Sequence, residues 1–483
     1  MFIKELEKRT AGTLTENLAY AVDTTTSSLL DLFAISGALR TRTEEDIRLK
    51  FNSAFSEDAL LATKLAFYTR NIRGGLGERD TFRYMLKELA KISPAVLLKN
   101  LHLVSHFGRW DDLFILFDSS VEKEMVQLVQ EQLVQDKENA EQGNSISLLA
   151  KWMPSISTSS KDTVALAKRF AEAWKMSYKD YGKMLTELRA YLKVVEVDMT
   201  AQDWNSINYE NVPSNAMTKY RNAFYKKDKV RFTDYIEEVK KGQAKIQSAT
   251  LYPYNIVEKI LYSKEQNDVL ELQWKALPNY VSGENNFLVM ADVSESMTGR
   301  PMATSVGLAI YFAERNKGPF AGKYMTFSAV PEIANVSGTT LYDKIKYVEK
   351  HRVGYNTDLE LAFMTVLQTA VEIKCSQEDL PQSIIIVSDM EIDAYSIKGG
   401  NLSFYDEMKD RFAQHGYQIP NIVFWNVDSR HDTYHAFEDN VNVMLVSGQA
   451  ASTFRLIMEG LNLTPYEVML KALNDPQYDI ITI

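Results

Sequence analysis

The stretch FLVMADVSESMTGRPM, residues 287–302, places an uninterrupted apolar run directly before an acid and two hydroxyls. The apolar run predicts a buried strand that ends at Asp292, and the Gly-Arg-Pro turn after it predicts the start of a helix. Ser294 and Ser296 follow the acid at alternate positions. A strand that is apolar throughout and leads into a helix is typical of a parallel sheet covered on both faces.

Four further apolar runs downstream repeat this pattern, and helical patterns separate most of them. These runs are residues 323–329, 383–390, 421–427 and 441–447. Together with the first run they predict an α/β doubly wound domain over residues 281–483.

Residues 1–280 differ, because their apolar residues recur at three- and four-residue spacing and strand alternation is rare. The segment ALLATKLAFYTRNI, for example, places Leu61, Leu65 and Tyr68 on one stripe. No repeat of fixed length is obvious, but paired helices at irregular intervals predict an all-α, HEAT-like helical-repeat domain. We therefore expect two domains with a boundary near residue 280.

The composition, with 45% hydrophobic and 24% charged residues in a chain of 483, is that of a globular protein. The single cysteine, Cys375, excludes an intrachain disulfide framework and a cysteine-based zinc site. The charged N-terminal stretch lacks the apolar core of a secretory signal, and no segment approaches the ~20 apolar residues of a membrane helix. We expect a cytoplasmic protein with no membrane segment.

The net charge of −10 is distributed unevenly along the chain. Residues 1–280 hold 39 Lys and Arg against 38 Asp and Glu, whereas residues 281–483 hold 15 against 26. Acidic domains are common, so this asymmetry by itself identifies no partner. It does direct any nucleic-acid surface to the N-terminal half, although that half is far less basic than typical nucleic-acid-binding domains.

Two acids end predicted strands, Asp292 and Asp389, and ligands in such sheets bind beyond the carboxyl ends of the strands. The loop GYNTDLE, residues 354–360, adds Thr357 at the start of a helix. Carboxylate and hydroxyl oxygens are hard ligands that suit Mg²⁺, or Mn²⁺ or Ca²⁺.

A serine nucleophile is the weaker interpretation, because no histidine lies near these strand ends and the G-x-S-x-G motif is absent. A phosphate cradle needs glycines at the turn, and residues 293–298 contain none. The residues also remain compatible with strand-end caps and turns that bind no ion.

The D-x-S-x-S pattern with a later Thr and Asp resembles the metal-ion-dependent adhesion site of von Willebrand factor A domains. The resemblance implies that Asp292, Ser294, Ser296 and Thr357 surround a cation, with Asp389 acting directly or through a water. Sites of that family leave one coordination position for an acidic group of a partner. Glu295 departs from the family pattern, in which a small residue usually separates the serines.

Long phrases of the N-terminal half resemble an uncharacterised family of Ro-like proteins, which join a TROVE-type helical-repeat module to a C-terminal A domain. The phrases are TRNIRGGLGERDTFRYML, HFGRWDDLFIL, LLAKWMPS, VPSNAMTKYRNAF and YIEEVKKGQAKI. The resemblance covers nearly the whole chain, and its link onward to the Ro ribonucleoprotein rests on shared architecture. It implies a ring of helical repeats that binds structured or misfolded noncoding RNA.

Arginines surround the glycines at 74, 75 and 77, and residues 218–232 interleave cations with aromatic side chains, as in phosphate contact with base stacking. A capping ion-pair network that includes Glu78 and Asp80 explains the first cluster equally well. The candidate RNA-contacting residues are Arg70, Arg73, Arg79, Arg83, Arg109, Lys151, Lys219, Arg221, Lys226 and Lys227.

These features together predict a non-catalytic, Ro-like protein that binds noncoding RNA through its helical half. Its A domain is expected to hold a divalent cation that recruits an acidic protein partner or a phosphate. The competing hypothesis is a protein-interaction scaffold that uses the same metal site and has no role with RNA. A metal-dependent hydrolase is a third alternative.

Overall fold

The computed structural model describes residues 2–281, 286–326, 331–350, 358–392 and 404–483. The chain forms two compact units. The α/β unit comprises residues 1–81 and 246–479, and the helical unit comprises residues 82–245 and 480–483. No helix among the described residues is both long and apolar enough to cross a lipid bilayer.

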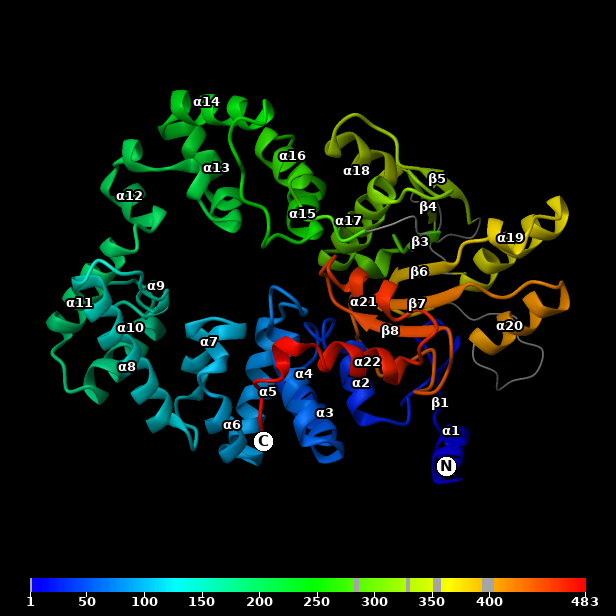
Figure 1. Ribbon diagram of the computed structural model, residues 1–483, viewed down its shortest axis with the longest axis horizontal. Helices are drawn as coiled ribbons and strands as arrows, with labels where there is room; N and C mark the ends of the chain where they lie inside the picture. The colour runs from blue at the N-terminus through cyan, green and yellow to red at the C-terminus, as the bar shows by residue number, and fades with distance from the viewer. Residues whose placement is uncertain (1, 282–285, 327–330, 351–357, 393–403) are drawn as a thin grey trace. The chain divides into compact units, whose positions relative to one another are not determined.

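The α/β unit is built on a six-stranded sheet with the order β5-β4-β3-β6-β7-β8 (Figure 1). Every neighbouring pair is parallel except β4 and β5, which are antiparallel. The strands are β3 (Phe287–Ala291), β4 (Lys323–Thr326), β5 (Ile333–Asn335), β6 (Ser383–Ser388), β7 (Asn421–Asn426) and β8 (Val443–Ser447).

All five predicted strands are present, and β3, β6, β7 and β8 are buried along their whole length. The predicted all-parallel sheet is wrong at one edge, where the three-residue strand β5 pairs antiparallel with β4. Its sequence, IAN, is too short to give a recognisable alternation, and only Ala334 of the three is buried.

Helices cover both faces of this sheet. α17 (Arg300–Arg315) packs against β3, β4 and β6 on the face that carries Val289, Ile385 and Trp425. α19 (Leu359–Ile373) lies on the other face, where its Thr365 borders a cavity beside Leu288. This two-sided cover explains why the strands are apolar without alternation.

Further helices of the C-terminal part belong to the same unit as the sheet. They are α15 (Pro253–Ser263), α16 (Asp268–Lys275), α18 (Leu341–Lys350), α20 (Phe404–Gln414), α21 (Thr453–Glu459) and α22 (Pro465–Leu473), with the short 3₁₀ helices η4 (Glu295–Met297), η5 (Gln377–Asp379) and η6 (Pro476–Tyr478).

The first part of the chain belongs to the same unit as the sheet, so the division into compact units differs from a boundary at residue 280. Helix α2 packs against β8 and α22, as Figure 1 shows. Gly37 has no room for a side chain, because a Cβ atom there would stand 2.5 Å from the Cα atom of Gly448. The elements concerned are α1 (Phe2–Thr10), β1 (Gly12–Leu14), β2 (Tyr20–Val22), α2 (Ser28–Ile35), α3 (Glu44–Glu57) and α4 (Ala59–Arg70).

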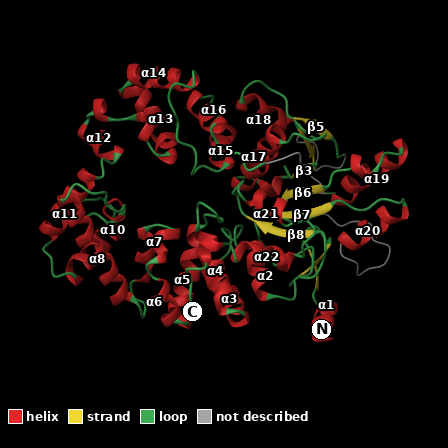
Figure 2. Cartoon of the chain, viewed as in Figure 1, coloured by secondary structure: helices red, strands yellow, loops and turns green. Residues whose placement is uncertain are grey.

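Except for the antiparallel pair β1 and β2, the described residues before 281 are helices and loops (Figure 2). In the helical unit, helices adjacent in sequence pack as pairs, for example α10 with α11 and α13 with α14. The predicted combination of a helical N-terminal part and a C-terminal α/β domain is confirmed.

The elements of the helical unit, with the helix that leads into it, are α5 (Arg79–Ile92), α6 (Pro94–Asn100), α7 (Leu103–Phe107), η1 (Trp110–Leu116), α8 (Glu122–Glu141), α9 (Leu149–Trp152), α10 (Lys161–Ala173), α11 (Tyr178–Tyr191), α12 (Val195–Ala201), η2 (Trp204–Ser206), η3 (Tyr209–Asn211), α13 (Ser214–Lys227) and α14 (Lys229–Lys240). The C-terminal residues 480–483 also belong to this unit, where Asn100 forms two hydrogen bonds with the backbone of Thr482.

Candidate metal centre

The two predicted acids meet because β3 and β6 are neighbours in the sheet. Ala291 pairs with Val387, so Asp292 and Asp389 follow adjacent strand ends. The Asp292 amide continues the ladder by donating to the Val387 carbonyl oxygen at 3.0 Å. Both carboxylates are buried, with 0% and 1% of each residue exposed. The sheet therefore places two buried acids at its carboxyl edge.

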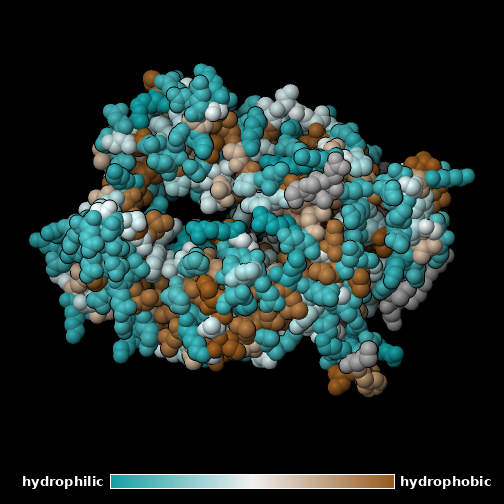
Figure 3. All heavy atoms as spheres, viewed as in Figure 1, coloured by the Kyte–Doolittle hydropathy of each residue, from teal (hydrophilic) through white to brown (hydrophobic). Residues whose placement is uncertain are grey.

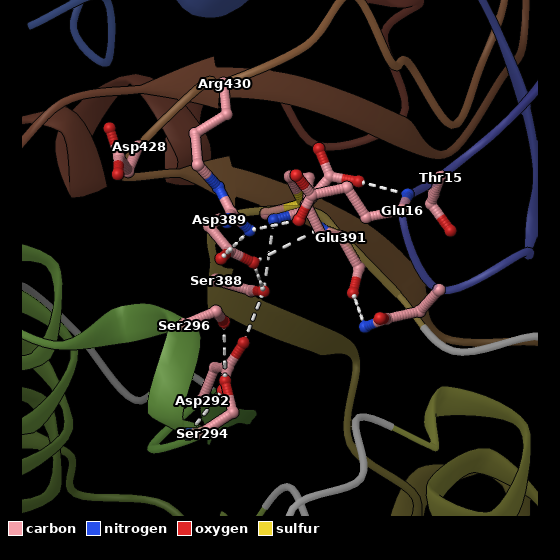
Figure 4. Close-up of polar contacts among 12 residues, drawn as sticks. Thr15, Glu16, Asp292, Ser294, Ser296, Ser388, Asp389, Glu391, Asp428 and Arg430 are labelled. Atoms are coloured by element: carbon pink, nitrogen blue, oxygen red, sulfur yellow. Dashed lines mark hydrogen bonds and ion pairs between the residues drawn. The ribbon is translucent and has the colours of Figure 1, made fainter. Parts of the chain in front are cut away.

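The DVSES segment folds back on its own acid. The Ser294 amide donates to Asp292 Oδ1 at 2.9 Å, and the hydroxyls of Ser294 and Ser296 lie 3.0 Å apart (Figure 4). Ser294 is buried and Ser296 is exposed. Glu295, which departs from the adhesion-site pattern, has an exposed side chain at the start of η4. The segment thus presents two adjacent hydroxyl oxygens beside a buried carboxylate.

Ser388, which was not predicted, joins the two acids. Its hydroxyl donates to Asp292 Oδ2 at 2.6 Å and lies 3.4 Å from Asp389 Oδ1. Because a hydroxyl carries one proton, the short bond to Asp292 takes it. The Ser388 oxygen in turn accepts from the Met390 amide at 3.1 Å. In the sequence, the only indication of Ser388 is its place directly before Asp389 at the end of an apolar run, which puts a hydroxyl next to the acid.

The turn after Asp389 is held in an uncommon backbone conformation. Met390 has φ +67°, the left-handed region that side chains other than glycine rarely adopt. The expectation that no histidine lies near these strand ends is wrong, because His435 Nε2 lies 3.0 Å from the Met390 carbonyl oxygen and donates to it. Burial lowers the His435 pKa to about 4, so the ring is neutral near pH 7. These contacts keep the loop beside the two acids in one shape.

Asp389 is paired with an arginine that sequence reasoning missed. Arg430 Nη2 lies 2.8 Å from Asp389 Oδ2, while Asp389 Oδ1 accepts from the Glu391 amide at 3.2 Å. Arg430 follows β7, the neighbour of β6, so it reaches the same sheet edge. Asp428, on the same loop, has its pKa raised by burial and by repulsion from Asp389. Nothing in the local pattern VDSRHD distinguishes these residues from a solvated loop.

In the segments that the structure describes, Asp292 has no such cationic partner. Within the described residues its oxygens meet the Ser388 hydroxyl and the Ser294 amide, and it forms no ion pair. Burial, followed by repulsion from Asp389, raises the pKa of Asp292 to about 6, and the hydrogen bonds from Ser388 and Ser294 oppose that rise. A buried carboxylate without a counter-charge is costly, and proteins usually pair it or use it to bind a metal.

The donor chemistry fits a hard divalent cation. Asp292, Ser294 and Ser296 offer one carboxylate and two hydroxyls within a single turn. No group of three His, Cys, Asp or Glu side chains that would hold a metal occurs in the part of the chain that the structure describes. A cation here therefore depends on hydroxyl oxygens as ligands. Thr357, the fourth predicted ligand, lies outside the described residues.

Two family models together match most of the chain. Residues 15–138 and 168–285 match the model described as Domain of unknown function (DUF2828), and residues 286–477 match Domain of unknown function (DUF7788). The DUF2828 match alone covers half of the chain. The chain belongs to the DUF2828 family. The predicted membership of an uncharacterised family is confirmed.

Two other proteins are similar to this chain along nearly its whole length. An uncharacterized protein, L728, of Acanthamoeba polyphaga mimivirus is 28% identical over 95% of this chain and 86% of its own length. The crystal structure of the Ro (RSR) protein of Deinococcus radiodurans matches over 92% of each chain, with 15% identity and a TM-score of 0.37. The family assignment does not depend on either likeness.

Three of the predicted RNA-contacting arginines are buried or paired with acids within the protein. Arg70 and Arg221 are only 2% and 4% exposed, and Arg221 donates to the Thr218 carbonyl oxygen. Arg83 pairs with Asp111 at 2.9 Å and with Asp112 at 2.8 Å. Sequence reasoning placed them on a surface because arginine is rarely buried and no local pattern marks the exceptions.

The other candidates are accessible to different degrees. Arg73, Lys219, Lys226 and Lys227 are exposed, and the half-exposed Arg79 lies 3.2 Å from Asp80. In the helical unit, Arg109 stacks over the Trp152 ring at 4.5 Å, and Lys151 lies 5.9 Å from the same ring. Figure 3 shows a largely hydrophilic surface over α8, α10 and α11 of that unit.

The glycines of RGGLG have a packing role that the sequence interpretation did not foresee. A Cβ atom on Gly75 would stand 2.0 Å from the Tyr68 carbonyl oxygen. Gly77 has φ +72°, and a Cβ there would lie 2.1 Å from the Tyr252 hydroxyl. Close packing therefore explains both glycines without a phosphate ligand.

Proposed function

We propose that the protein is a non-catalytic binding protein with two functions. At the carboxyl edge of its sheet it binds Mg²⁺, or Mn²⁺ or Ca²⁺, through Asp292, Ser294 and Ser296, with Thr357 and Asp389 as the further predicted ligands. That cation recruits an acidic group of a protein partner or a phosphate. The helical unit binds noncoding RNA.

The observation that carries the cation proposal is the isolated charge of Asp292. Its carboxylate is fully buried, repelled by Asp389, and without an ion pair among the described residues. Two hydroxyl oxygens lie within the same turn, where they add ligands without adding charge. A bound divalent ion supplies the missing positive charge and, by keeping an open coordination position, attracts an anionic group.

Binding is favoured over catalysis by the hydroxyls' surroundings. Ser294 and Ser296 bond to each other, and in the described part of the chain neither hydroxyl has a histidine partner. His435, the buried histidine of this region, is neutral and occupied by the Met390 carbonyl oxygen. A serine without a base is a weak nucleophile but a good oxygen ligand.

Magnesium is expected to raise the thermal midpoint of the α/β unit, and Asp292→Ala is expected to abolish that increment. At free Mg²⁺ about 100-fold above its dissociation constant, the gain is about 2.7 kcal/mol, which corresponds to several degrees. Differential scanning calorimetry with Mg²⁺ or EDTA measures it. Glu459→Gln, an exposed acid on α21, serves as the control and should keep the full increment. An increment that survives in Asp292→Ala would place the cation elsewhere.

RNA binding is supported by the pairing of cations with aromatic rings in the helical unit. Arg109 and Lys151 share the Trp152 ring, and Lys219 lies 4.8 Å from the Tyr220 ring. Lys151 also lines a cavity of about 510 Å³ in this unit. Both rings are partly exposed, and cations beside accessible aromatic rings suit phosphate contact combined with base stacking.

Single-stranded and hairpin RNA are expected to bind with an affinity that falls steeply between 50 and 200 mM salt. Replacing Lys226 and Lys227 by Gln should lower affinity for all sequences and reduce the single-strand salt slope by about 1.4, since each phosphate contact contributes about 0.7. Fluorescence anisotropy measures both quantities. Lys137→Gln with Lys183→Gln on α8 and α11 removes the same charge as a control. Absence of RNA affinity at low salt would favour a scaffold that binds polypeptide.

A further inference from the structure

We infer that Arg430 sets the cation affinity of the sheet-edge site and couples that site to the N-terminal segment Thr15–Asn17. The inference rests on the proposed cation site. In it, the Arg430 guanidinium competes with the cation for Asp389, and Glu16 is the second carboxylate that draws the guanidinium away. Figure 4 shows these residues together at the sheet edge.

One amino group of Arg430 is shared between two acids. Its Nη2 atom lies 2.8 Å from Asp389 Oδ2 and 3.0 Å from Glu16 Oε2. Asp389 is 1% exposed, whereas the Glu16 side chain is 41% exposed. The guanidinium therefore stands between a buried acid that belongs to the site and a more accessible acid that does not.

A second donor of Arg430 lacks a partner in the part of the chain that the structure describes: its Nε atom is buried and forms no hydrogen bond there. Arg40, by contrast, uses Nε and Nη2 on Glu78 and Nη1 on Gln449, each at 2.7 or 2.8 Å. The unpaired, buried N–H of Arg430 carries a free-energy cost that another arrangement of the side chain removes.

Competition follows from the charge of the two ligands of Asp389. A positive guanidinium on Oδ2 lowers the attraction of that carboxylate for any second cation, because like charges at one carboxylate repel. Asp292 lies on the far side of Ser388 and forms no ion pair in the described residues. When the guanidinium moves away from Asp389, the carboxylates of both Asp292 and Asp389 can therefore bind a divalent ion.

The N-terminal segment is tied to the loop that follows Asp389. The Glu16 amide donates to Glu391 Oε2 at 2.7 Å, and Asn17 Nδ2 donates to the Glu391 carbonyl oxygen at 2.7 Å. Thr15 Oγ1 donates to the Ile392 carbonyl oxygen at 2.6 Å. Glu16 Oε1 also lies 2.7 Å from His431 Nε2. When Arg430 moves from Asp389 toward Glu16, it therefore changes the charge balance and the contacts of residues 15–17.

Isothermal titration of the full chain with Mn²⁺ tests the inference. Arg430→Gln is expected to tighten binding about tenfold, because the competing charge is gone. Glu16→Gln is expected to weaken binding about threefold in the wild-type background and less than about 1.5-fold when Arg430 is already Gln, since its effect acts through Arg430. Lys323→Gln removes an equal charge at the amino end of β4, away from the carboxyl ends of the strands, and should change the Mn²⁺ affinity little.

The outcomes separate this inference from the proposed site. If the wild type binds Mn²⁺ and Arg430→Gln binds it with equal or lower affinity, the cation site is supported and the role of Arg430 is overturned. No Mn²⁺ binding by either protein overturns both. A second readout needs no variant: Mg²⁺ should slow hydrogen exchange of the Glu16 amide in the wild type, because Arg430 then pairs with Glu16 alone. Unchanged exchange contradicts the coupling even if Arg430→Gln fails to fold.

Discussion

Replacing Gly75 by Ala is expected to lower the free energy of unfolding by about 3 kcal/mol or more. The added Cβ atom would stand 2.0 Å from the Tyr68 carbonyl oxygen, a backbone atom of α4 that cannot rotate away. Two hydrogen bonds fix the turn at this separation, from the Gly75 amide to Asn71 and from the Leu76 amide to Tyr68, each at 3.1 Å. Urea unfolding followed by circular dichroism measures the loss.

The adjacent glycine provides the matched control. A Cβ on Gly74 would lie 2.8 Å from the amide nitrogen of the Gln477 side chain. That side chain can rotate away at the cost of one hydrogen bond from Asn71 Nδ2, so Gly74→Ala should cost only about 1 kcal/mol. If Gly75→Ala instead retained its stability and lost RNA affinity, the glycines would serve phosphate approach, as the motif alone suggested.

Replacing Asp292 by Asn is expected to stabilise the cation-free protein at pH 7.5 by about 2–3 kcal/mol. The folded-state pKa of Asp292 is raised, so the folded protein binds more protons than the unfolded chain between about pH 4 and pH 6. Its contribution to stability is therefore present at low pH and is lost as the pH rises through about 6. Asn removes the buried charge, so the difference in unfolding free energy between Asp292→Asn and the wild type should shrink toward pH 4.

Saturating Mg²⁺ should reverse the order of the two proteins, because only the carboxylate gains a counter-charge. Chemical denaturation at pH 4.5 and 7.5, with Mg²⁺ or EDTA, gives the four required comparisons. Asp410→Asn, an exposed acid on α20, is expected to show neither the pH dependence nor the reversal. A variant that is less stable than wild type in EDTA at pH 7.5 would show that Asp292 is satisfied without a cation.

The sequence alone located the two acids and their hydroxyls. Apolar runs predicted β3 and β6, and parallel strands place their carboxyl ends at one edge, so Asp292 and Asp389 had to lie close together once the strands paired. The D-x-S-x-S spacing likewise anticipated that Ser294 and Ser296 present neighbouring hydroxyls. These features depend on local pattern and on a general rule of sheet topology.

The partners of those acids were not predictable in the same way. Arg430 and Glu16 are 414 residues apart in numbering and meet only because residues 15–17 lie along the loop after β6. No periodicity marks either residue. The same limit applies to Arg70 and Arg221, whose motifs looked like exposed basic clusters and whose side chains are buried.

The sequence by itself determined a helical first part, five apolar strands alternating with helices after it, and the chemistry of the DVSES segment, because periodicity and turn residues act over a few neighbouring positions. Only the tertiary structure decided that residues 1–81 join the sheet's unit and that Gly75 must lack a side chain. It also decided that, among the described residues, Asp389 pairs with an arginine and Asp292 does not. Those outcomes depend on the burial and charge of groups brought together from distant parts of the chain, and such contacts leave no signature at either position.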